Sequence, residues 1–399
     1  MATTGAVWAT LFLAACQGED RPRVEIIAST GTPTGSVSGS GSGTGSVSGV
    51  LPAVSTPTRT AGGTPVATTA PGSATAGSEH YKPVSDVQSY LDLALDVRDI
   101  VTLMAPAAEG KPVSWVVVSG IYTGGANART GTGALRNLKG LATSAPVLAE
   151  FPNGPAVYGS PAFLDDTVQA GLSGTGRGQG LSENARRQLV EKGISAILYG
   201  KTLQEMTAAR AKVQQSQLAD KDGAPHNVDE AWGLYAGTVD GQGNRPWSLV
   251  SIAVKREANF KLDGKLDAPI QKAMEAAKAA AQKGDLVAFD KAAAEVRGRM
   301  NGIFYLATLR YVKSAADAKD AAARQVVLAE GYGFWQTIRA GVASANAHGA
   351  NRIQALYNGD ANTVVPASAV TDVYGALNSP EVLKALGVPE DIIVRQPPA

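Results

Sequence analysis

The sequence predicts a mainly α-helical fold, and two patterns carry the prediction. Apolar residues recur every three or four positions along several long segments, which is the spacing of one face of a helix. Residues that typically begin and end helices bracket those segments. One short apolar run, Trp115 to Val118, has the composition of a strand, although a buried helical turn has the same composition. We therefore expect helices packed on helices.

The first expected helix covers residues 86–104, where the apolar positions follow the i, i+3, i+4 spacing and Pro106 ends the pattern. Glycine-rich stretches follow around residues 120–140 and 171–180. Because glycine favours turns, we expect ordered loops in both places.

Two further helices are predicted in the second half of the chain. Asp267 is expected to cap the first of them, which carries Pro269 in its opening turn and stops at Gly284. Asp285 is expected to cap the next helix directly afterwards. A connection this short predicts that the two helices form an antiparallel pair.

Short internal echoes suggest a two-fold repeat of helical units. The segment 197–203 resembles 303–309, and the segment 230–235 resembles 330–335. Such a repeat would bring equivalent Glu, Tyr and Trp clusters together across a pseudo-symmetric interface. Chance similarity in an alanine-rich chain is the alternative.

Residues 1–15 have the pattern of a lipoprotein signal peptide. A short apolar run ends in Leu13-Ala14-Ala15-Cys16, a small-residue cleavage site followed by cysteine. The run is too short to span a bilayer. We expect residues 16–28 to be a lipidated N-terminus with the lipid on Cys16, although no Lys or Arg precedes the apolar run.

Residues 29–78 are expected to form a disordered tether. They consist almost wholly of Gly, Ser, Thr, Pro, Ala and Val, and Arg59 is their one charged residue. A segment of this composition cannot bury a hydrophobic core. Residues 79–399 are then the globular helical domain, held near a membrane by the lipid.

Charge and cysteine content exclude several classes of function. The chain has 36 Lys and Arg against 35 Asp and Glu, a formal net charge of +1. This balance gives no electrostatic reason to expect a nucleic-acid partner. Cys16 is the sole cysteine of the sequence, which excludes intrachain disulfides and cysteine-based zinc sites.

The sequence lacks the common catalytic motifs. It contains no G-x-S-x-G, no H-E-x-x-H and no G-x-x-x-x-G-K-[ST] pattern. The glycines of residues 171–180 follow no clear βαβ pattern, so they are a weak candidate for a dinucleotide loop. We expect no enzymatic turnover.

The chemically densest stretch runs from Pro225 to Gly237. It places His226, Asp229, Glu230 and Tyr235 within a dozen residues. If the chain is helical from Asp229 onward, nitrogen and oxygen donors gather at the N-terminus of that helix.

Carboxylate and phenol oxygens suit a hard cation, Fe(III) above all. Lys255 and Arg256 could hold an accompanying anion or balance the carboxylates, with Tyr122 as a further residue near the site. The structural alternative makes Asp229 a helix cap and Glu230 a partner of the helix dipole. The predicted metal ligands are His226, Asp229, Glu230, Tyr235, Glu330 and Tyr332.

The stretch 225–237, followed by 253–260, resembles the signature of the Fea-type iron-assimilatory proteins, the low-iron-inducible periplasmic proteins first known from algae. Residues 119–124 and 298–305 are also similar to that family. The resemblance implies an extracellular helical protein that helps to gather iron at the cell surface. More loosely it implies a tie to the phytotransferrins, which bind ferric iron together with carbonate. The N-terminal cysteine motif and the tether depart from the family pattern.

The sequence therefore predicts a lipid-anchored, extracytoplasmic protein of a bacterial membrane, periplasmic or at the cell surface. We expect it to bind Fe(III), with carbonate, and to present the iron to a separate transporter. The alternative is a non-metal surface protein for adhesion, envelope structure, or binding of a small organic solute or carbohydrate. A sugar groove would show exposed tryptophan rings. The candidates are Trp115, Trp232, Trp247 and Trp335.

Overall fold

The computed structural model describes residues 81–397. Over this range the chain is mainly α-helical and contains no β-strand, which confirms the predicted fold class. The expected signal peptide (1–15), lipidated segment with Cys16 (16–28) and tether (29–78) lie outside the described residues.

The helix predicted over residues 86–104 is present, with a break at Asp92 that separates α1 from α2. A 3-10 turn continues past Met104 and ends at Gly110, whose φ of 70° closes the turn. The first elements are α1 (Gln88–Leu91), α2 (Leu93–Met104), η2 (Ala105–Glu109), α3 (Trp115–Gly124), α4 (Leu138–Ala142), α5 (Ala145–Leu148) and α6 (Gly154–Tyr158).

The run from Trp115 to Val118 is the first turn of α3 and not a strand. Val118 and Tyr122 lie one turn apart and are both buried, whereas Val116 is 85% exposed. A helix returns every third or fourth residue to the same face, so the neighbouring valines face solvent. The run is therefore helical but only partly buried.

The glycine-rich stretches predicted as loops are partly helical. The first includes the end of α3, and the loop behind it closes with an isolated bridge between Arg129 and Leu135. The second lies on the end of α7 (Phe163–Ser173) and on the 3-10 turn η3 (Gly176–Gly178). The glycine content of these stretches therefore did not distinguish the ends of helices from loops.

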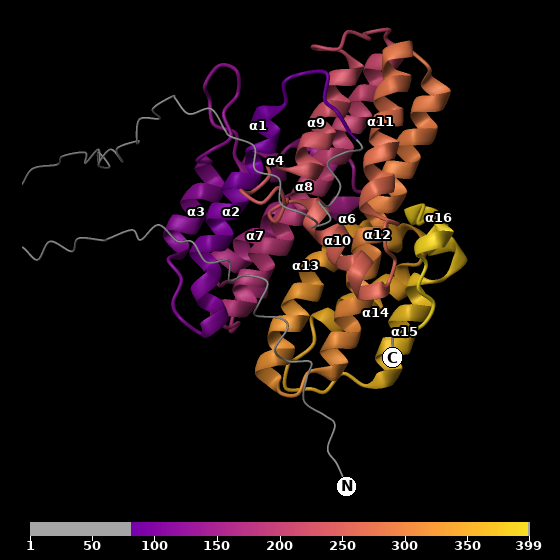
Figure 1. Ribbon diagram of the computed structural model, residues 1–399. Coiled ribbons are helices and arrows are strands. Elements are labelled where there is room, and N and C mark those ends of the chain that lie inside the picture. The colour runs from indigo at the N-terminus through magenta and orange to yellow at the C-terminus, as the bar shows by residue number, and fades with distance from the viewer. Residues whose placement is uncertain (1–80, 398–399) are drawn as a thin grey trace, which may run out of the picture. The chain divides into compact units, whose positions relative to one another are not determined.

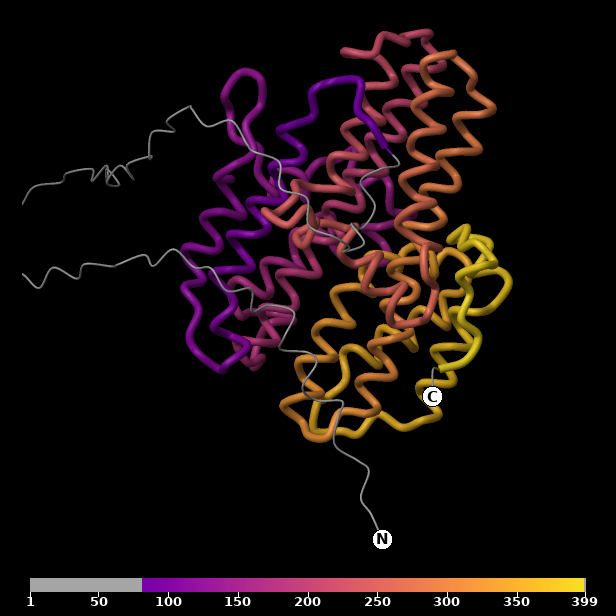
Figure 2. The backbone as a smooth tube through the Cα atoms, in the orientation of Figure 1, coloured from indigo at the N-terminus to yellow at the C-terminus, as the bar shows by residue number. Residues whose placement is uncertain are grey.

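The long helix α8 (Glu183–Gln214) is the centre of the arrangement. It packs against α7 and against two helices from later in the chain, α9 (Ala224–Ala236) and α13 (Ala321–Ala345) (Figure 1). The backbone trace runs from the N-terminal helices on one side to the C-terminal helices on the other (Figure 2). Residues distant in sequence therefore meet along α8.

The predicted helical pair consists of α11 (Asp267–Lys283) and α12 (Leu286–Asp317), which follow α10 (Leu249–Phe260) and pack side by side. Gly284 ends α11 in the left-handed conformation, and the Asp285 carboxylate accepts a hydrogen bond from the Ala288 amide at the start of α12. Both features confirm the predicted hairpin. Asp267 is the first residue of α11 and does not cap it, because its carboxylate bonds side chains instead.

The structure does not confirm the internal repeat. α8 and α12 have 32 residues each, but α9 has 13 residues and α13 has 25, so Glu230 and Glu330 lie on unlike helices. The chain ends with α14 (Ala347–Tyr357), α15 (Ala367–Leu377), α16 (Pro380–Leu386) and η4 (Glu390–Ile392).

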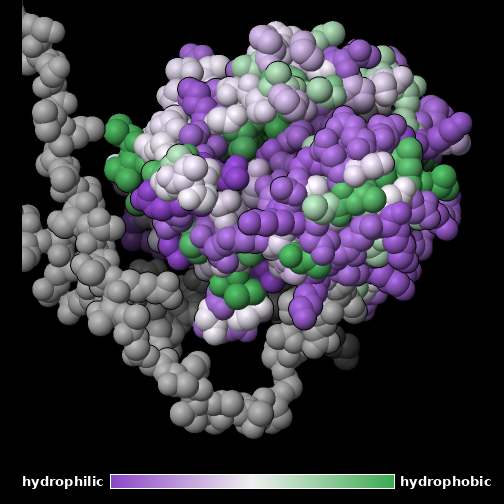
Figure 3. Space-filling model, turned by 90° about the horizontal axis from the view of Figure 1, so that it is seen from above, coloured by the Kyte–Doolittle hydropathy of each residue, from purple (hydrophilic) through white to green (hydrophobic). Residues whose placement is uncertain are grey.

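Aromatic side chains are mostly inside the domain. Trp232 and Trp335 are buried, and Trp115 and Trp247 are partly buried. Seen from above, the surface is mainly hydrophilic with small separate hydrophobic patches (Figure 3). Within residues 81–397, the large hydrophobic side chains that are exposed are all valines. This observation weighs against a sugar groove lined by tryptophan. None of the described helices is long and apolar enough to cross a bilayer.

Candidate functional site

The helix that carries the densest stretch begins at Ala224, earlier than Asp229. Pro225 lies in its first turn, where the fixed φ of proline suits a helix start. His226 and Glu230 are consequently one turn apart on the same face of α9. His226 Nε2 lies 3.2 Å from Glu230 Oε1.

A second carboxylate joins this pair from α8. Asn227 Nδ2 donates to Glu205 Oε2 at 2.5 Å and to Glu230 Oε2 at 3.3 Å, so the two carboxylates share one amide. Lys201 pairs with Glu205. We call His226, Glu230, Glu205, Asn227 and Lys201 the His226 cluster. The side chain of Glu205 is 3% exposed, that of Glu230 13% and that of His226 23%, so the cluster reaches solvent through His226.

The two carboxyl groups and the imidazole of the cluster differ in their affinity for protons. Burial raises the pKa of the Glu205 carboxyl, and the charge of Glu230 adds to the rise against the opposing Lys201. Burial also acts to raise the pKa of Glu230, but the hydrogen bond and charge of His226 outweigh it, so this pKa is lowered. The same hydrogen bond raises the pKa of His226. Glu205 therefore takes up a proton more readily than Glu230 does.

Asp229 faces away from this cluster and binds the segment of residues 81–85, which we call the N-terminal segment, to α9. Its Oδ1 accepts a hydrogen bond from Tyr81 at 2.6 Å. Its Oδ2 accepts from the amides of Val84 and Ser85 and from the Ser85 hydroxyl. The carboxylate is buried, and these donors occupy both of its oxygens. The ring of Tyr81 also stacks on Trp232 with centroids 5.0 Å apart.

Ser85 connects Asp229 to His226. Its hydroxyl donates to Asp229, which leaves the oxygen to accept a hydrogen bond from His226 Nδ1 at 2.8 Å. This arrangement places a proton on Nδ1 and directs Nε2 toward Glu230. The chain Asp229, Ser85, His226 therefore orients the imidazole.

Tyr235 belongs to a different network. It is fully buried, and its hydroxyl donates to Asp267 Oδ1 at 2.9 Å. Gln271 also donates to Asp267. Burial, followed by the charge of Asp267, raises the pKa of the Tyr235 phenol well above its ordinary value. Its proton is held tightly.

Glu330 lies between α8, α12 and α13 with two of the predicted anion residues nearby. Glu330 Oε1 accepts a hydrogen bond from Tyr311 at 2.6 Å and pairs with Lys192 at 3.2 Å. Arg256 is 4% exposed, and its Nε and Nη1 atoms have no hydrogen-bond partner among the described residues. Burial lowers the pKa of Arg256. Lys255 is exposed beside it.

The remaining predicted residues lie in further places. Tyr122 is fully buried on α3, and its hydroxyl donates to Asp165 at 2.8 Å. Tyr332 is partly buried, and the guanidinium of Arg177 lies 5.1 Å from its ring centroid. The structure therefore brings His226 and Glu230 together and distributes the other predicted ligands over separate networks. In the described part of the chain, no group of three or more His, Cys, Asp and Glu side chains is arranged to hold a metal ion.

Sequence reasoning missed Glu205, Lys201 and Ser85. The signal for Glu205 was present, because it lies three residues after Thr202 and four before Ala209, on the buried face of α8. A carboxylate at a buried helical position needs a partner. The sequence did not show that the partners come from α9.

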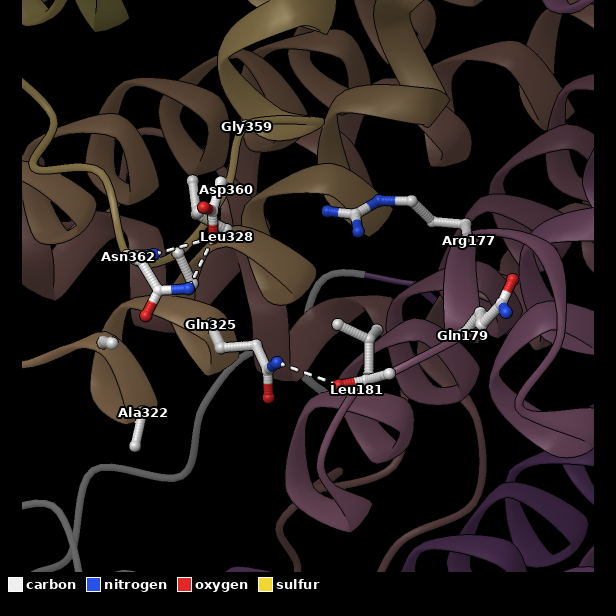
Figure 4. A pocket seen from close by; sticks show the side chains of 12 residues that line it. Arg177, Gln179, Leu181, Ala322, Gln325, Leu328, Gly359, Asp360 and Asn362 are labelled. Atoms are coloured by element: carbon white, nitrogen blue, oxygen red, sulfur yellow. Dashed lines mark hydrogen bonds between the residues drawn. The ribbon is translucent and has the colours of Figure 1, made fainter.

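Two cavities, each of about 380 Å³, lie elsewhere in the domain and share Arg177. In the first, Arg177 points into the cavity from one side, opposite Asp360 and Asn362 (Figure 4). Gln325 lines the same cavity and donates to the carbonyl oxygen of Gly180. The second cavity contains Tyr332 and Arg339.

A sequence profile of the family described as low iron-inducible periplasmic protein (Fea1) matches residues 54–337. The matched range includes every residue of the His226 cluster together with Asp229 and Glu330. No curated protein and no solved structure matches the chain.

Proposed function

Since the chain belongs to the low iron-inducible periplasmic protein family, we propose that it binds iron outside the cytoplasm and does so at the His226 cluster. The family supplies the periplasmic location and the connection to iron. The geometry supports the place. The observation that carries the proposal is that His226 Nε2 lies beside the Glu230 carboxylate, which shares the Asn227 amide with Glu205. Because these groups are not arranged as a metal site in the described part of the chain, they must close around the ion to hold it.

This set of donors fits iron. Imidazole nitrogen and carboxylate oxygen are both ligands that iron accepts. In the metal-free protein, protonated His226 balances the negative charge of Glu230, and Lys201 balances that of Glu205. A multiply charged cation can take over that role, provided that the ammonium group of Lys201 moves away from Glu205. Binding should therefore release protons.

The hydrogen bonds of Ser85 and Asp229 favour His226 as a metal ligand. A metal-binding histidine commonly donates its second ring nitrogen to an acceptor that fixes the ring. The hydrogen bond from His226 Nδ1 to Ser85, backed by Asp229, supplies this support. In this proposal Asp229 positions the imidazole and does not itself contact iron.

We propose Fe(III) as the bound ion, because two neighbouring carboxylates attract it more strongly than they attract Fe(II), which carries a lower charge. Carbonate would supply further oxygen ligands, with Lys201 as the nearby cation. The Fe(III) state and the carbonate come from the resemblance to the phytotransferrins and from ligand chemistry.

The proposal also includes the setting of the domain. A lipid on Cys16 and the tether of residues 29–78 would hold the domain at a bacterial membrane. The protein would hand its iron to a separate transporter and catalyse no reaction.

Titration of the full-length chain with ferric iron, in competition with a chelator of known affinity, tests the proposal. We expect one ferric ion per chain, and at least tenfold weaker binding in His226→Gln and in Glu230→Gln. Glu381→Gln is the matched control, because Glu381 is an exposed carboxylate on α16. Binding by the wild type that survives both substitutions would reject the His226 cluster as the site. No binding by the wild type would reject the function.

A further inference from the structure

The second cavity is lined by two arginines, Arg177 and Arg339, that have no part in the iron proposal. Its walls come from α6, α7, the η3 turn and α13. We call it the Tyr332 cavity. The residues that matter here are Tyr158, Phe163, Asp166, Arg177, Tyr332 and Arg339.

Arg177 is a half-buried cation without a carboxylate partner. Within residues 81–397 no Asp or Glu forms an ion pair with it. Its Nη2 donates to the carbonyl oxygen of Tyr357 at 2.6 Å, while its buried Nε has no hydrogen-bond partner. Burial lowers the pKa of Arg177.

Arg339 is the second cation of the cavity, and it too lacks a carboxylate partner in the described part of the chain. Its guanidinium lies 5.3 Å from the ring centroid of Tyr158, and its Nη1 lies 3.4 Å from Gln336 Oε1, a long hydrogen bond. Both Arg177 and Arg339 act to lower the pKa of the Tyr332 phenol, so both lie near that ring. The one carboxylate in the lining, Asp166, is exposed, and its charge acts to raise the same pKa.

The cavity thus offers two guanidinium groups and a phenol beside aromatic walls. The rings of Tyr158 and Phe163 stack with centroids 4.3 Å apart. Guanidinium groups bind carboxylates and phosphates with paired hydrogen bonds. A volume of about 380 Å³ falls in the range of small-molecule sites, and ring faces provide contact for an organic body.

We infer that the Tyr332 cavity binds a small organic anion with two or more carboxylate groups, held between Arg177 and Arg339. Two cations accommodate two carboxylates of one molecule. The cavity of Figure 4 is a poorer place for such an anion, because Arg177 is the one cation in its lining, whereas the Tyr332 cavity has Arg177 and Arg339.

The inference goes beyond the iron proposal, and it is tested without iron. Calorimetric titration of the metal-free, full-length chain with citrate, succinate and inorganic phosphate measures the binding directly. We expect saturable binding of citrate or succinate that weakens at high salt. Arg339→Gln should reduce the affinity at least tenfold. Arg352→Gln removes an equal charge from an exposed position on α14 and should leave the affinity unchanged.

Arg177→Gln is the less informative variant, because it also removes the hydrogen bond to Tyr357 that ties η3 to α14. Within residues 81–397 Arg339 forms no hydrogen bond to another element, so its variant decides the question even if the Arg177 variant unfolds. Failure of both carboxylates to bind, or equal binding in Arg339→Gln, would overturn the inference. Binding of phosphate alone would overturn the carboxylate assignment. None of these outcomes depends on whether iron binds at the His226 cluster.

Discussion

His226 and Glu230 lie one turn apart on α9, with Nε2 and Oε1 separated by 3.2 Å. The other ring nitrogen of His226 is held by Ser85, which in turn donates to Asp229. This order gives each residue a distinct part. Glu230 and Glu205 supply the negative charge, His226 supplies nitrogen, and Asp229 fixes the imidazole and the N-terminal segment together.

Replacing Asp229 by Asn should destabilise the domain. The substitution removes the charged acceptor of the hydrogen bonds from Tyr81, Val84 and Ser85. Hydrogen bonds to charged groups contribute about 1.5–3 kcal/mol each, so we expect the free energy of unfolding to fall by about 2 kcal/mol or more. Urea unfolding measures the loss. Amide hydrogen exchange at Val84 and Ser85 should accelerate, and Asp317→Asn, an exposed change, should alter neither quantity. Unchanged stability and protection would disprove the fastening role of Asp229.

His226 should make the stability of the metal-free protein depend on pH. Its pKa is raised by the hydrogen bond that its Nε2 donates to the Glu230 carboxylate, so folding favours the protonated imidazole. This contribution is fully present below the unfolded pKa of about 6.5 and is lost as pH rises through the higher folded value. The difference in free energy of unfolding between wild type and His226→Gln should therefore be larger at pH 6 than at pH 9. Urea titrations at the two pH values measure it. A difference that stays constant, or grows with pH, contradicts the assignment.

Tyr235→Phe should leave ferric iron binding unchanged. The Tyr235 hydroxyl is buried with Asp267, in a network separate from the His226 cluster. The loss of one hydrogen bond to a carboxylate should lower the free energy of unfolding by about 1–3 kcal/mol. Chelator competition and urea unfolding measure the two effects. Loss of iron affinity in this variant, without unfolding, would restore Tyr235 as a ligand and count against the proposed site.

Gly178→Ala should disrupt the η3 turn. A Cβ atom on Gly178 would lie 1.8 Å from the backbone carbonyl oxygen of Ala170, so the loop that carries Arg177 must shift. We expect a lower melting temperature. Gly120→Ala is the control, because nothing lies within 4 Å of its Cβ position on α3, and there the change should stabilise by about 0.5–1 kcal/mol. Equal melting temperatures for the two variants would show that η3 tolerates the shift.

The helical fold was predictable because periodicity and caps are local properties. Asp285 caps α12 and Gly284 ends α11, both as their residue types suggest. The run from Trp115 to Val118 was ambiguous for the same reason, since four apolar residues fit a strand and a helix equally well.

The residues of the site were predictable only in part. Helical geometry explains why some predicted ligands lie in the His226 cluster and others do not. Successive residues of a helix point about 100° apart, so Glu230 faces α8 while Asp229 faces the segment of residues 81–85. Glu330 and Tyr332 are two positions apart and point to different sides of α13, which separates their networks. Glu205 entered the cluster through the packing of α8 on α9, and no local pattern encodes that contact.

The most direct measurement is anomalous diffraction at the iron absorption edge from crystals of the ferric-loaded protein. The account predicts one peak per chain, placed within bonding distance of His226 Nε2 and of carboxylate oxygens of Glu230 and Glu205, with Lys201 displaced from Glu205. A peak in the network of Glu330 and Arg256, or beside Tyr332, would contradict the account.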